Sequence, residues 1–250
     1  MKFSIAIPAR LGSTRLPGKV LADLGGKPVL RHVWEAANRV NGANEVVVLT
    51  ESPEVQDVVK NWGGICYLTP ESCNNGTERV CSALDRLSGD LIFNIQSDEP
   101  FLRAELIEAM IARASMNGVF DILTPVYSIK NADDIFNPNV VKVVLGHAEQ
   151  ALYFSRSPIP YVRSTDMSQW LFRVPFFGHL GIYLYGREVL EQLNLIPPSP
   201  LAAAESLEQL RFLQAGRRIQ TILTDEASIA IDTPEDLARA RKVIRESAIP

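Results

Sequence analysis

Short apolar runs typical of β-strands alternate with stretches of helical periodicity along the first hundred residues. The strand-like runs fall at 2–7, 45–50, 65–69 and 90–95, and the helix-like stretches at 27–40, 53–62 and 77–87. This β-α-β-α order predicts a mostly parallel sheet with helices on both faces. Ligands of such sheets bind beyond the carboxyl ends of the strands. The segments expected to carry function therefore follow the strands, at 8–19, 50–52, 70–79 and 96–100.

The second half of the chain has a less regular pattern. Strands are predicted at 120–129, 139–145, 177–185 and 218–223, and helices at 202–215, before Gly216, and at 233–244. Residues 150–176 are rich in aromatic residues, arginine and proline without clean periodicity, and residues 197–200 form a rigid break. We therefore expect residues 1–250 to form a single α/β domain with an inserted arm at roughly 150–200.

Composition narrows the class of protein. The chain has 250 residues, 46% of them hydrophobic, and a net charge of −4, which does not favour general nucleic-acid binding. Its three cysteines form no C-x-x-C pair, and an odd number argues against a disulfide framework, so a reducing compartment is expected. We find no run of 18 apolar residues and no signal-peptide pattern. These features predict a cytoplasmic protein that binds neither membrane nor nucleic acid.

The loop after the first strand concentrates positive charge. Arg10, Arg15 and Lys19 lie within ten residues that contain no acid, and Gly12 and Gly18 allow the chain to bend. A cationic, glycine-bearing loop between a strand and a helix can hold phosphates through side chains, backbone N–H groups and the positive end of the helix. The glycine spacing fits neither a Walker loop nor G-x-G-x-x-G. An ordinary solvated turn is the alternative interpretation.

Two acidic segments are candidates for a metal site. Asp98 lies in Gln96-Ser97-Asp98-Glu99-Pro100, directly after a predicted strand, where carboxylates suit a hard cation such as Mg²⁺. The same residues are good turn formers, so a plain turn remains open. Asp232 precedes Thr233, a natural N-cap for the last helix, whereas Glu235 and Asp236 are typical helix-start acids. Asp232 is therefore the one acid of that segment that could face a ligand.

The histidines give weaker signals. His32 falls within a predicted helix and is interpreted as structural. His179 lies between Gly178 and Gly181 in a predicted strand, which suggests close approach of a ligand or of another backbone, although a satisfied core histidine is the alternative. No Ser-His-Asp or Cys-His arrangement stands out.

Taken in order, the motifs resemble those of a known family over nearly the whole chain. They are the loop from Ile7 to Lys19, Asn75-Gly76-Thr77-Glu78-Arg79, Asn94 to Pro100, Phe136 to Asn139, Ala151 to Arg156, His179 to Tyr183, Pro198 to Leu201, Leu207 to Arg211 and Asp232 to Leu237. Each motif is modest alone, but their order and spacing are specific. The chain resembles the 3-deoxy-manno-octulosonate cytidylyltransferase family, which makes CMP-Kdo for lipopolysaccharide.

The resemblance implies a Rossmann-like nucleotide-diphospho-sugar transferase fold with a dimerisation arm, and a homodimer. It implies an enzyme that joins CTP and Kdo to give CMP-Kdo and pyrophosphate with Mg²⁺ as cofactor. By the same resemblance Arg10, Arg15 and Lys19 hold the CTP phosphates, Asp98 and Asp232 bind Mg²⁺, and Lys19 joins these two acids as catalytic. The other substrate-binding residues implied are Asn75, Gly76 and Arg79 near the cytosine, Gln96, Arg163, His179, Tyr183, Glu208 and Gln209 in the sugar-acid pocket, and Ser13 and Arg156.

The chain departs from the family pattern at several positions. Glu51-Ser52, Cys73, Asn75, Ser97, Gly178 and Ala202 stand where the family usually has other residues. Because the phosphate loop and both acids are intact, these changes bear on the sugar and on the fit around the base. Activation of 8-amino-Kdo or of a sialic acid therefore remains open. So do two rival classes, a metal-dependent glycosyltransferase and a non-catalytic protein that binds a nucleotide or a sugar acid.

Overall fold

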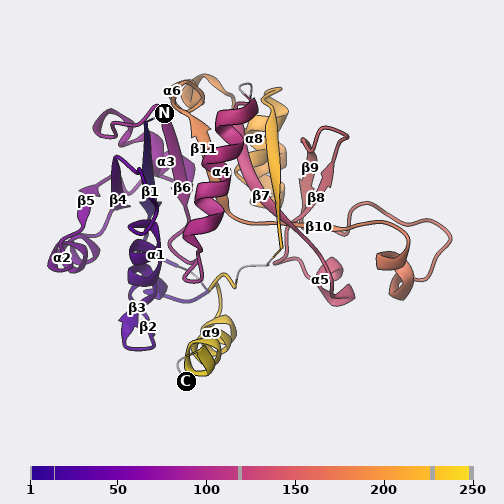
Figure 1. The fold of residues 1–250 in the computed structure, drawn as a ribbon, viewed down its shortest axis with the longest axis horizontal. Coiled ribbons are helices and arrows are strands. Elements are labelled where there is room, and N and C mark those ends of the chain that lie inside the picture. Colours follow the sequence, from indigo (N-terminus) through magenta and orange to yellow (C-terminus); the bar gives the residue numbers. More distant parts are fainter. Residues whose placement is uncertain (1, 14, 118–119, 226–228, 248–250) are drawn as a thin grey trace. The chain divides into compact units, whose positions relative to one another are not determined.

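The computed structural model describes residues 2–13, 15–117, 120–225 and 229–247 (Figure 1). Thr14 of the cationic loop lies outside the described residues. Contacts between Cα atoms divide the chain into two compact units, one of Met1–Ala109 with Ser228–Pro250 and one of Met110–Ala227. The prediction of a single domain with an arm stays a prediction.

The first unit is built on four parallel strands in the order β5-β4-β1-β6. They are β1 (Phe3–Pro8), β4 (Glu45–Thr50), β5 (Ile65–Leu68) and β6 (Leu91–Ile95). A separate short hairpin is formed by β2 (Asp23–Leu24) and β3 (Lys27–Pro28). The helices are α1 (Val29–Ala37), α2 (Pro53–Asn61), α3 (Gly76–Cys81), α9 (Pro234–Ser247) and α4 (Ala104–Asn117), which continues into the second unit. Every residue of β1 is buried, as expected for a central parallel strand covered on both faces.

The second unit contains five strands in the order β11-β7-β10-β8-β9, in which neighbouring strands are antiparallel. A further strand, β12, runs parallel to β7. The strands are β7 (Ile122–Ser128), β8 (Lys142–Leu145), β9 (Ala151–Ser155), β10 (Phe177–His179), β11 (Ile182–Gly186) and β12 (Ile219–Thr224). The helices are α5 (Ala132–Phe136), α6 (Arg187–Glu191), α7 (Pro200–Glu205) and α8 (Gln209–Gln214). The α/β class is therefore confirmed.

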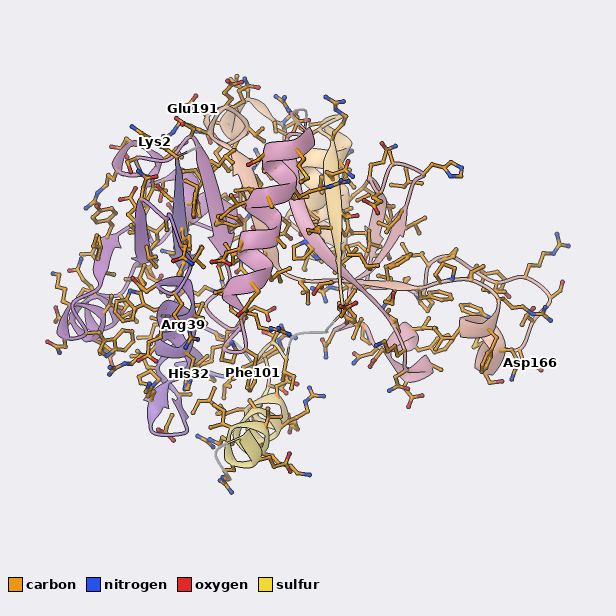
Figure 2. All side chains as sticks on the ribbon, in the orientation of Figure 1. Lys2, His32, Arg39, Phe101, Asp166 and Glu191 are labelled. Carbon is orange, nitrogen blue, oxygen red and sulfur yellow. The ribbon has the colours of Figure 1, made fainter. Side chains whose placement is uncertain are left out.

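A long excursion leaves the end of β9 and returns to β10 through the 3-10 helix Met167–Phe172 (Figure 1). Trp170 is 2% exposed and packs with Ile129, Ile135 and Phe176. The aromatic stretch, for which the pattern suggested no core role, thus has a small core of its own. Figure 2 shows the side chains that project from this excursion around Asp166.

Several predicted elements are interrupted in the structure. The strand predicted at 177–185 is two strands, β10 and β11, separated at residues 180–181. The helix predicted at 202–215 is two helices, and the break falls at Ser206, whose φ is 51°. The helix predicted at 77–87 ends at Cys81. Helices α4, α5 and α6 and strand β9 were not predicted, although the buried residues Ile107, Met110 and Ala114 of α4 lie at helical spacing.

Among the residues that the structure describes, no helix combines the length and the apolar composition that crossing a bilayer requires.

Candidate active site

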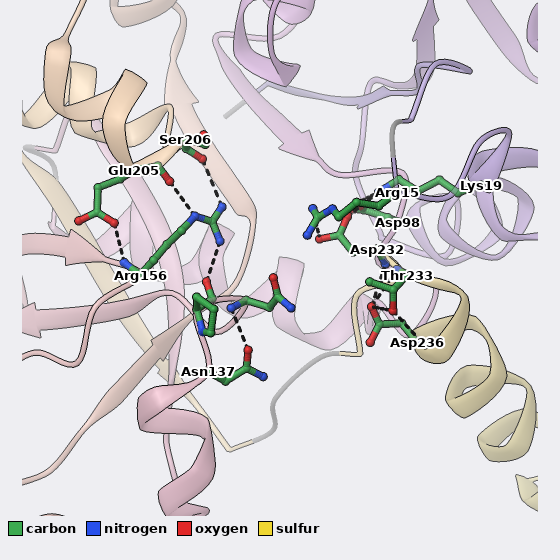
Figure 3. A network of polar contacts seen from close by, with 12 residues as sticks. Arg15, Lys19, Asp98, Asn137, Arg156, Glu205, Ser206, Asp232, Thr233 and Asp236 are labelled. Atoms are coloured by element: carbon green, nitrogen blue, oxygen red, sulfur yellow. Dashed lines mark hydrogen bonds and ion pairs between the residues drawn. The ribbon is translucent and has the colours of Figure 1, made fainter. Parts of the chain in front are cut away.

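Asp98 and Asp232 come from distant parts of the sequence and meet at one point of the first unit (Figure 3). Asp98 follows β6, as the pattern predicts. The N–H of Ile231 donates to the main-chain oxygen of Asp98 at 2.9 Å, which fixes the segment before α9 beside the end of β6. Ile231 itself is buried in a cluster with Leu24 and Val29. The two carboxylates are therefore brought together by the backbone and by core packing.

A lysine ammonium lies between the two carboxylates. Nζ of Lys19 is 2.6 Å from Oδ2 of Asp98 and 2.9 Å from Oδ1 of Asp232, and Nη2 of Arg15 is 2.9 Å from Oδ2 of Asp232. Burial acts to lower the pKa of Lys19, but the charges of Asp98 and Asp232 outweigh burial, and the net pKa lies above its usual value. Lys19 is consequently a fixed cation at the centre of this cluster.

The start of α9 holds Asp232 in place. Thr233 Oγ1 accepts from the N–H of Asp236 at 3.2 Å, and Asp236 Oδ2 accepts from the N–H groups of Thr233 at 3.0 Å and Asp232 at 3.2 Å. This is a reciprocal capping box, so Thr233 is the N-cap as predicted. With Asp236 committed to the cap, Asp232 is the acid of this segment that turns toward Lys19.

The cationic loop is shaped by its own backbone. Gly18 has a φ of 67°, a left-handed conformation that suits glycine, and its N–H donates to the oxygen of Leu11 at 3.2 Å. The N–H of Ser13 donates to the same oxygen at 3.1 Å, and Arg10 is exposed. Lys19 opens a three-residue 3-10 helix, and α1, which was predicted over 27–40, begins at Val29. Side-chain charge, rather than a helix dipole, supplies the positive potential here.

Arg79 is engaged in a buried ion pair. Its Nη2 lies 2.9 Å from Oε2 of Glu51, and its Nη1 donates to Oγ1 of Thr69 at 2.6 Å, with the side chain 4% exposed. Oε1 of Glu51 accepts from the N–H of Leu11 at 2.9 Å. Glu51, one of the departures from the family pattern, therefore links the cationic loop to α3. The proposed contact of Arg79 with a base stays a prediction.

Gly76, predicted with Asn75 near the cytosine, lies beside Gln96, which was predicted for the sugar-acid pocket. Asn75 is the N-cap of α3, since its Oδ1 accepts from the N–H of Glu78 at 2.9 Å. A Cβ at Gly76 would come within 2.7 Å of Nε2 of Gln96, so only glycine fits without a shift. Nε2 of Gln96 donates to Oδ1 of Asn94 at 3.1 Å. These contacts bring the start of α3 against the end of β6.

Two other departures also have local explanations. Ser52 is the N-cap of α2, because its Oγ accepts from the N–H of Val55 at 3.3 Å. A Cβ at Gly178 would lie 2.3 Å from Cζ of Tyr127, which stands opposite it in the β10–β7 pair. The Tyr127 ring therefore takes the space that a side chain at position 178 would need.

In the second unit, His179 is held by a threonine. Oγ1 of Thr124 lies 2.8 Å from Nε2 of His179 and 2.7 Å from the main-chain oxygen of Ile182. The single hydroxyl hydrogen of Thr124 goes to that carbonyl, so His179 must donate from Nε2, which leaves Nδ1 as an acceptor. Burial lowers the pKa of His179 to about 3. The ring is therefore neutral, packed between Phe154 and Tyr183.

Tyr183 and Gln209 form a buried polar pair beside His179. The hydroxyl of Tyr183 donates to Oε1 of Gln209 at 3.0 Å. Burial, and then the charge of Glu208, raises the pKa of Tyr183, which stays protonated. Gln209 is 1% exposed, yet its Nε2 has no hydrogen-bond partner within the described part of the chain. A buried donor without a partner is costly, and a ligand contact at Gln209 stays a prediction.

The remaining predicted residues are placed differently. The guanidinium of Arg156 donates to the main-chain oxygens of Glu205, Pro138 and Ser206 (Figure 3), whereas Arg163 is exposed in the excursion after β9. Sequence reasoning missed Thr124, Lys142 and Glu205. A lysine inside the apolar run Val140–Leu145 was a usable signal for Lys142, but nothing in the sequence distinguishes the other two.

The carboxylate pair has the donors that a hard cation prefers. Asp98 and Asp232 both lie within hydrogen-bond distance of one positive atom, so their oxygens converge on a point suited to a cation. Across the described ranges, no group of three or more His, Cys, Asp or Glu side chains forms a complete metal site. Mg²⁺ fits such a partial set, because it keeps waters and substrate phosphates among its ligands.

Comparison with known proteins agrees with this geometry. A family profile described as "Cytidylyltransferase" matches residues 5–219. A protein of Elusimicrobium minutum named 3-deoxy-manno-octulosonate cytidylyltransferase is 44% identical over 97% of this chain and 98% of its own length. A relative of the same name from Escherichia coli is 38% identical over 98% of this chain and 97% of its own.

Solved structures extend the similarity. One described as CMP:2-keto-3-deoxy-manno-octonic acid synthetase complexed with CTP has a TM-score of 0.91 at 38% identity and covers 99% of this chain and 100% of that chain. A cytidylyltransferase from Leptospira borgpetersenii, with a TM-score of 0.63 at 19% identity, shares the fold. The resemblance inferred from the motifs is confirmed, and the chain belongs to the family of 3-deoxy-manno-octulosonate cytidylyltransferases.

Proposed function

We propose that this protein joins CTP and Kdo to give CMP-Kdo and pyrophosphate, for lipopolysaccharide biosynthesis in the cytoplasm. Support comes above all from the convergence of Asp98 and Asp232 on the Lys19 ammonium at 2.6 and 2.9 Å. A non-catalytic binder has no need of paired carboxylates at such a point. A glycosyltransferase that consumes a sugar nucleotide is less consistent with three cations on the loop, since these suit a triphosphate.

The reaction is an in-line displacement at the α-phosphorus of CTP. The anomeric hydroxyl of Kdo forms the new O–P bond and loses its proton, while the bond to the β-phosphate breaks and pyrophosphate leaves. Lys19 and Arg15 neutralise the triphosphate and the charge that builds on the leaving group. Asp98 and Asp232 would hold Mg²⁺, which supplies Lewis-acid polarisation of the phosphate when bound.

Lys19 and Arg15 have to change partners when the nucleotide arrives. In the structure both cations form ion pairs with carboxylates, Lys19 with Asp98 and Asp232, and Arg15 with Asp232. Phosphate oxygens offer these cations equivalent charge-assisted hydrogen bonds, and the carboxylates are then free to bind a divalent cation. The cluster is therefore balanced in charge before substrate binds, with two cations against two carboxylates.

The sugar acid is proposed to bind in the second unit at His179, Tyr183 and Gln209. His179 offers the acceptor Nδ1, and Gln209 offers the donor Nε2 that lacks a partner within the described residues. A polyhydroxylated acid can satisfy both, since its hydroxyls donate and its carboxylate accepts. Glu208 and Arg163 are further proposed contacts in this pocket.

Pyrophosphate release tests the function. Purified protein with CTP and Mg²⁺ is given Kdo, 8-amino-Kdo or N-acetylneuraminic acid in parallel, with ATP in place of CTP as a nucleotide control. Release with CTP and Kdo is the expected result. Faster release with the amino sugar or the sialic acid would reassign the acceptor, and silence with all three in protein that binds CTP would overturn the proposal.

We also propose that the protein is a homodimer that pairs through the arm. Tyr161, Met167 and Phe172 are 73%, 58% and 81% exposed in the excursion between β9 and β10, and large apolar side chains gathered on a surface mark an interaction site. Light scattering after gel filtration should give twice the mass of one chain. Phe172→Asp should shift the protein toward the monomer, and a wild-type monomer at all concentrations would contradict the dimer.

A further inference from the structure

The break between α7 and α8 needs a physical cause. Residues 200–214 have good helix formers and would otherwise form one helix, but the chain turns at Ser206, with φ 51° and ψ 49°. A left-handed conformation is sterically unfavourable for a non-glycine residue, so surrounding contacts must hold it. Those contacts come from the residue just before the turn.

Glu205 fastens the end of α7 to the end of β9. Its Oε1 accepts from the hydroxyl of Ser155 at 2.6 Å, and its Oε2 accepts from the N–H of Arg156 at 2.8 Å. Its main-chain oxygen accepts from Nε of Arg156 at 2.7 Å (Figure 3). Three hydrogen bonds therefore anchor one residue, and two of them go to a carboxylate, which makes them stronger than neutral ones.

Arg156, which donates to Glu205, is itself fixed by further hydrogen bonds. Arg156 reaches past Glu205 to the main-chain oxygen of Ser206 at 3.4 Å. The main-chain oxygen of Arg156 accepts from Nζ of Lys142 at 2.6 Å, and the same ammonium donates to the oxygens of Asn137 and Val140. Lys142 is fully buried in β8. The end of β9 is thus a rigid support against which Glu205 is pinned.

The turn decides where α8 begins, and α8 begins with Gln209. Gln209 receives the Tyr183 hydroxyl on Oε1 and has the partnerless buried donor Nε2. We infer that Glu205 is a positioning residue. It fixes the turn at Ser206, so that Glu208 and Gln209 are held in the proposed sugar-acid pocket. This inference rests on the proposed function, and it assigns Glu205 no contact with substrate.

Kinetics of variants can separate positioning from general stability. In pyrophosphate-release assays with CTP and Kdo, Glu205→Ala should raise the KM for Kdo about ten- to a hundredfold, because a displaced binding group loses its alignment. The KM for CTP should stay within about twofold, since the nucleotide groups lie in the first unit. Isosteric Glu205→Gln keeps one acceptor and should give a smaller rise in the same KM.

A second variant tests the turn directly. Adding Ser206→Gly to Glu205→Gln should restore part of the affinity for Kdo, because glycine adopts the left-handed conformation without the steric cost. Asp121→Asn is the matched control, since Asp121 also accepts from a main-chain N–H, that of Arg218 at 2.7 Å, and pairs with Arg217. It should lower the melting temperature but leave the KM for Kdo unchanged.

The outcomes are distinct. The positioning role would be overturned if the wild type is active and both Glu205→Gln and Glu205→Ala leave the KM for Kdo unchanged. It would also be overturned if the KM for Kdo and the KM for CTP rise equally. Either result would leave the proposed function intact. A double variant no better than Glu205→Gln would overturn the role of the turn. A wild type inactive with every sugar acid would instead overturn the proposed function. Circular dichroism on each variant identifies any that fails to fold, and Glu205→Gln then decides the case.

Discussion

The charged cluster of the first unit and the polar pocket of the second differ in the charge and in the solvent exposure of their side chains. In the cluster, Arg15, Lys19, Asp98 and Asp232 carry full charges, and the exposed fractions run from 12% for Lys19 to 51% for Arg15. In the pocket, the side chains of His179, Tyr183 and Gln209 are neutral, and Gln209 is almost fully buried. The cluster therefore offers formal charges that water can reach, whereas the buried centre of the pocket offers uncharged hydrogen-bonding groups.

The difference teaches what each region can discriminate. Partly solvated ion pairs exchange partners at low cost, so the cluster can release Asp98 and Asp232 when phosphates arrive, but it reads little beyond charge. A buried neutral group that is left without a hydrogen-bond partner costs about 1 kcal/mol or more. The pocket should therefore reject ligands that lack the matching hydroxyl or carboxylate. We therefore expect the cluster to control turnover and the pocket to control the choice of acceptor.

Asp98→Asn should produce the largest effect. The amide keeps the shape of the carboxylate but removes the charge that pairs with Lys19 and that would hold Mg²⁺. Losing several kcal/mol of electrostatic stabilisation corresponds to a fall in kcat of about a hundred- to a thousandfold. Initial rates of pyrophosphate release at saturating CTP and Kdo measure it. Asp23→Asn is the control, because the Asp23 carboxylate accepts from the N–H of Gly26 in a turn. Near-normal turnover in Asp98→Asn would remove this carboxylate from the mechanism.

Lys19→Ala should act next on nucleotide affinity. Hydrogen bonds to charged groups contribute about 1.5–3 kcal/mol, so the KM for CTP should rise about ten- to a hundredfold. Lys27→Ala, which removes a partly exposed pair with Glu35 at 2.7 Å, should leave the KM for CTP unchanged. Without Lys19 the carboxylates repel each other, so Mg²⁺ should raise the melting temperature of Lys19→Ala more than that of the wild type. An equal affinity for CTP in Lys19→Ala and in the wild type would contradict the phosphate-binding role of the loop.

The charged cluster is also the part that the sequence could predict. A cationic loop after a strand, an acid at the end of a strand and an acid before an N-cap each follow local rules, and the topology of a parallel sheet brings such segments to one edge. Nothing local says that Asp232 would reach Lys19 rather than solvent. That depends on the hydrogen bond from Ile231 to Asp98, which joins residues 133 positions apart.

The pocket was harder to predict, because tertiary contacts override local preference there. Residues 202–215 have helical propensity throughout, and the break at Ser206 is imposed by Ser155 and Arg156 acting on Glu205. Likewise, the run from Phe177 to Tyr185 is a good strand that divides into two in the fold. Tyr183 and Gln209 could be named only through the family resemblance, since neither residue carries a local signal.

The pH dependence of acceptor binding sharpens the comparison. Because burial lowers the pKa of His179 to about 3, its ring stays neutral from pH 5 to 8 and should impose no transition on the KM for Kdo in that range. Stability should behave differently. Between pH 6.5 and about 3 the unfolded chain binds a proton at His179 and the folded chain does not, so stability falls as pH falls. Urea titrations of wild type and His179→Gln should show a steeper loss in the wild type, and parallel curves would mean that the ring protonates in the fold.

The smallest effect is expected at the start of α9, where the cluster depends on a helix cap. Thr233→Ala removes the hydroxyl that accepts from the N–H of Asp236, which should cost about 1 kcal/mol of stability by urea unfolding. Thr233→Ser keeps that hydroxyl and serves as the control. Because Ile231 and the Asp98 backbone also hold this segment, Asp232 should stay near Lys19 and kcat should fall less than about threefold. A loss of kcat as large as that of Asp98→Asn would mean that the cap, rather than the packing of Ile231, sets the position of the second carboxylate.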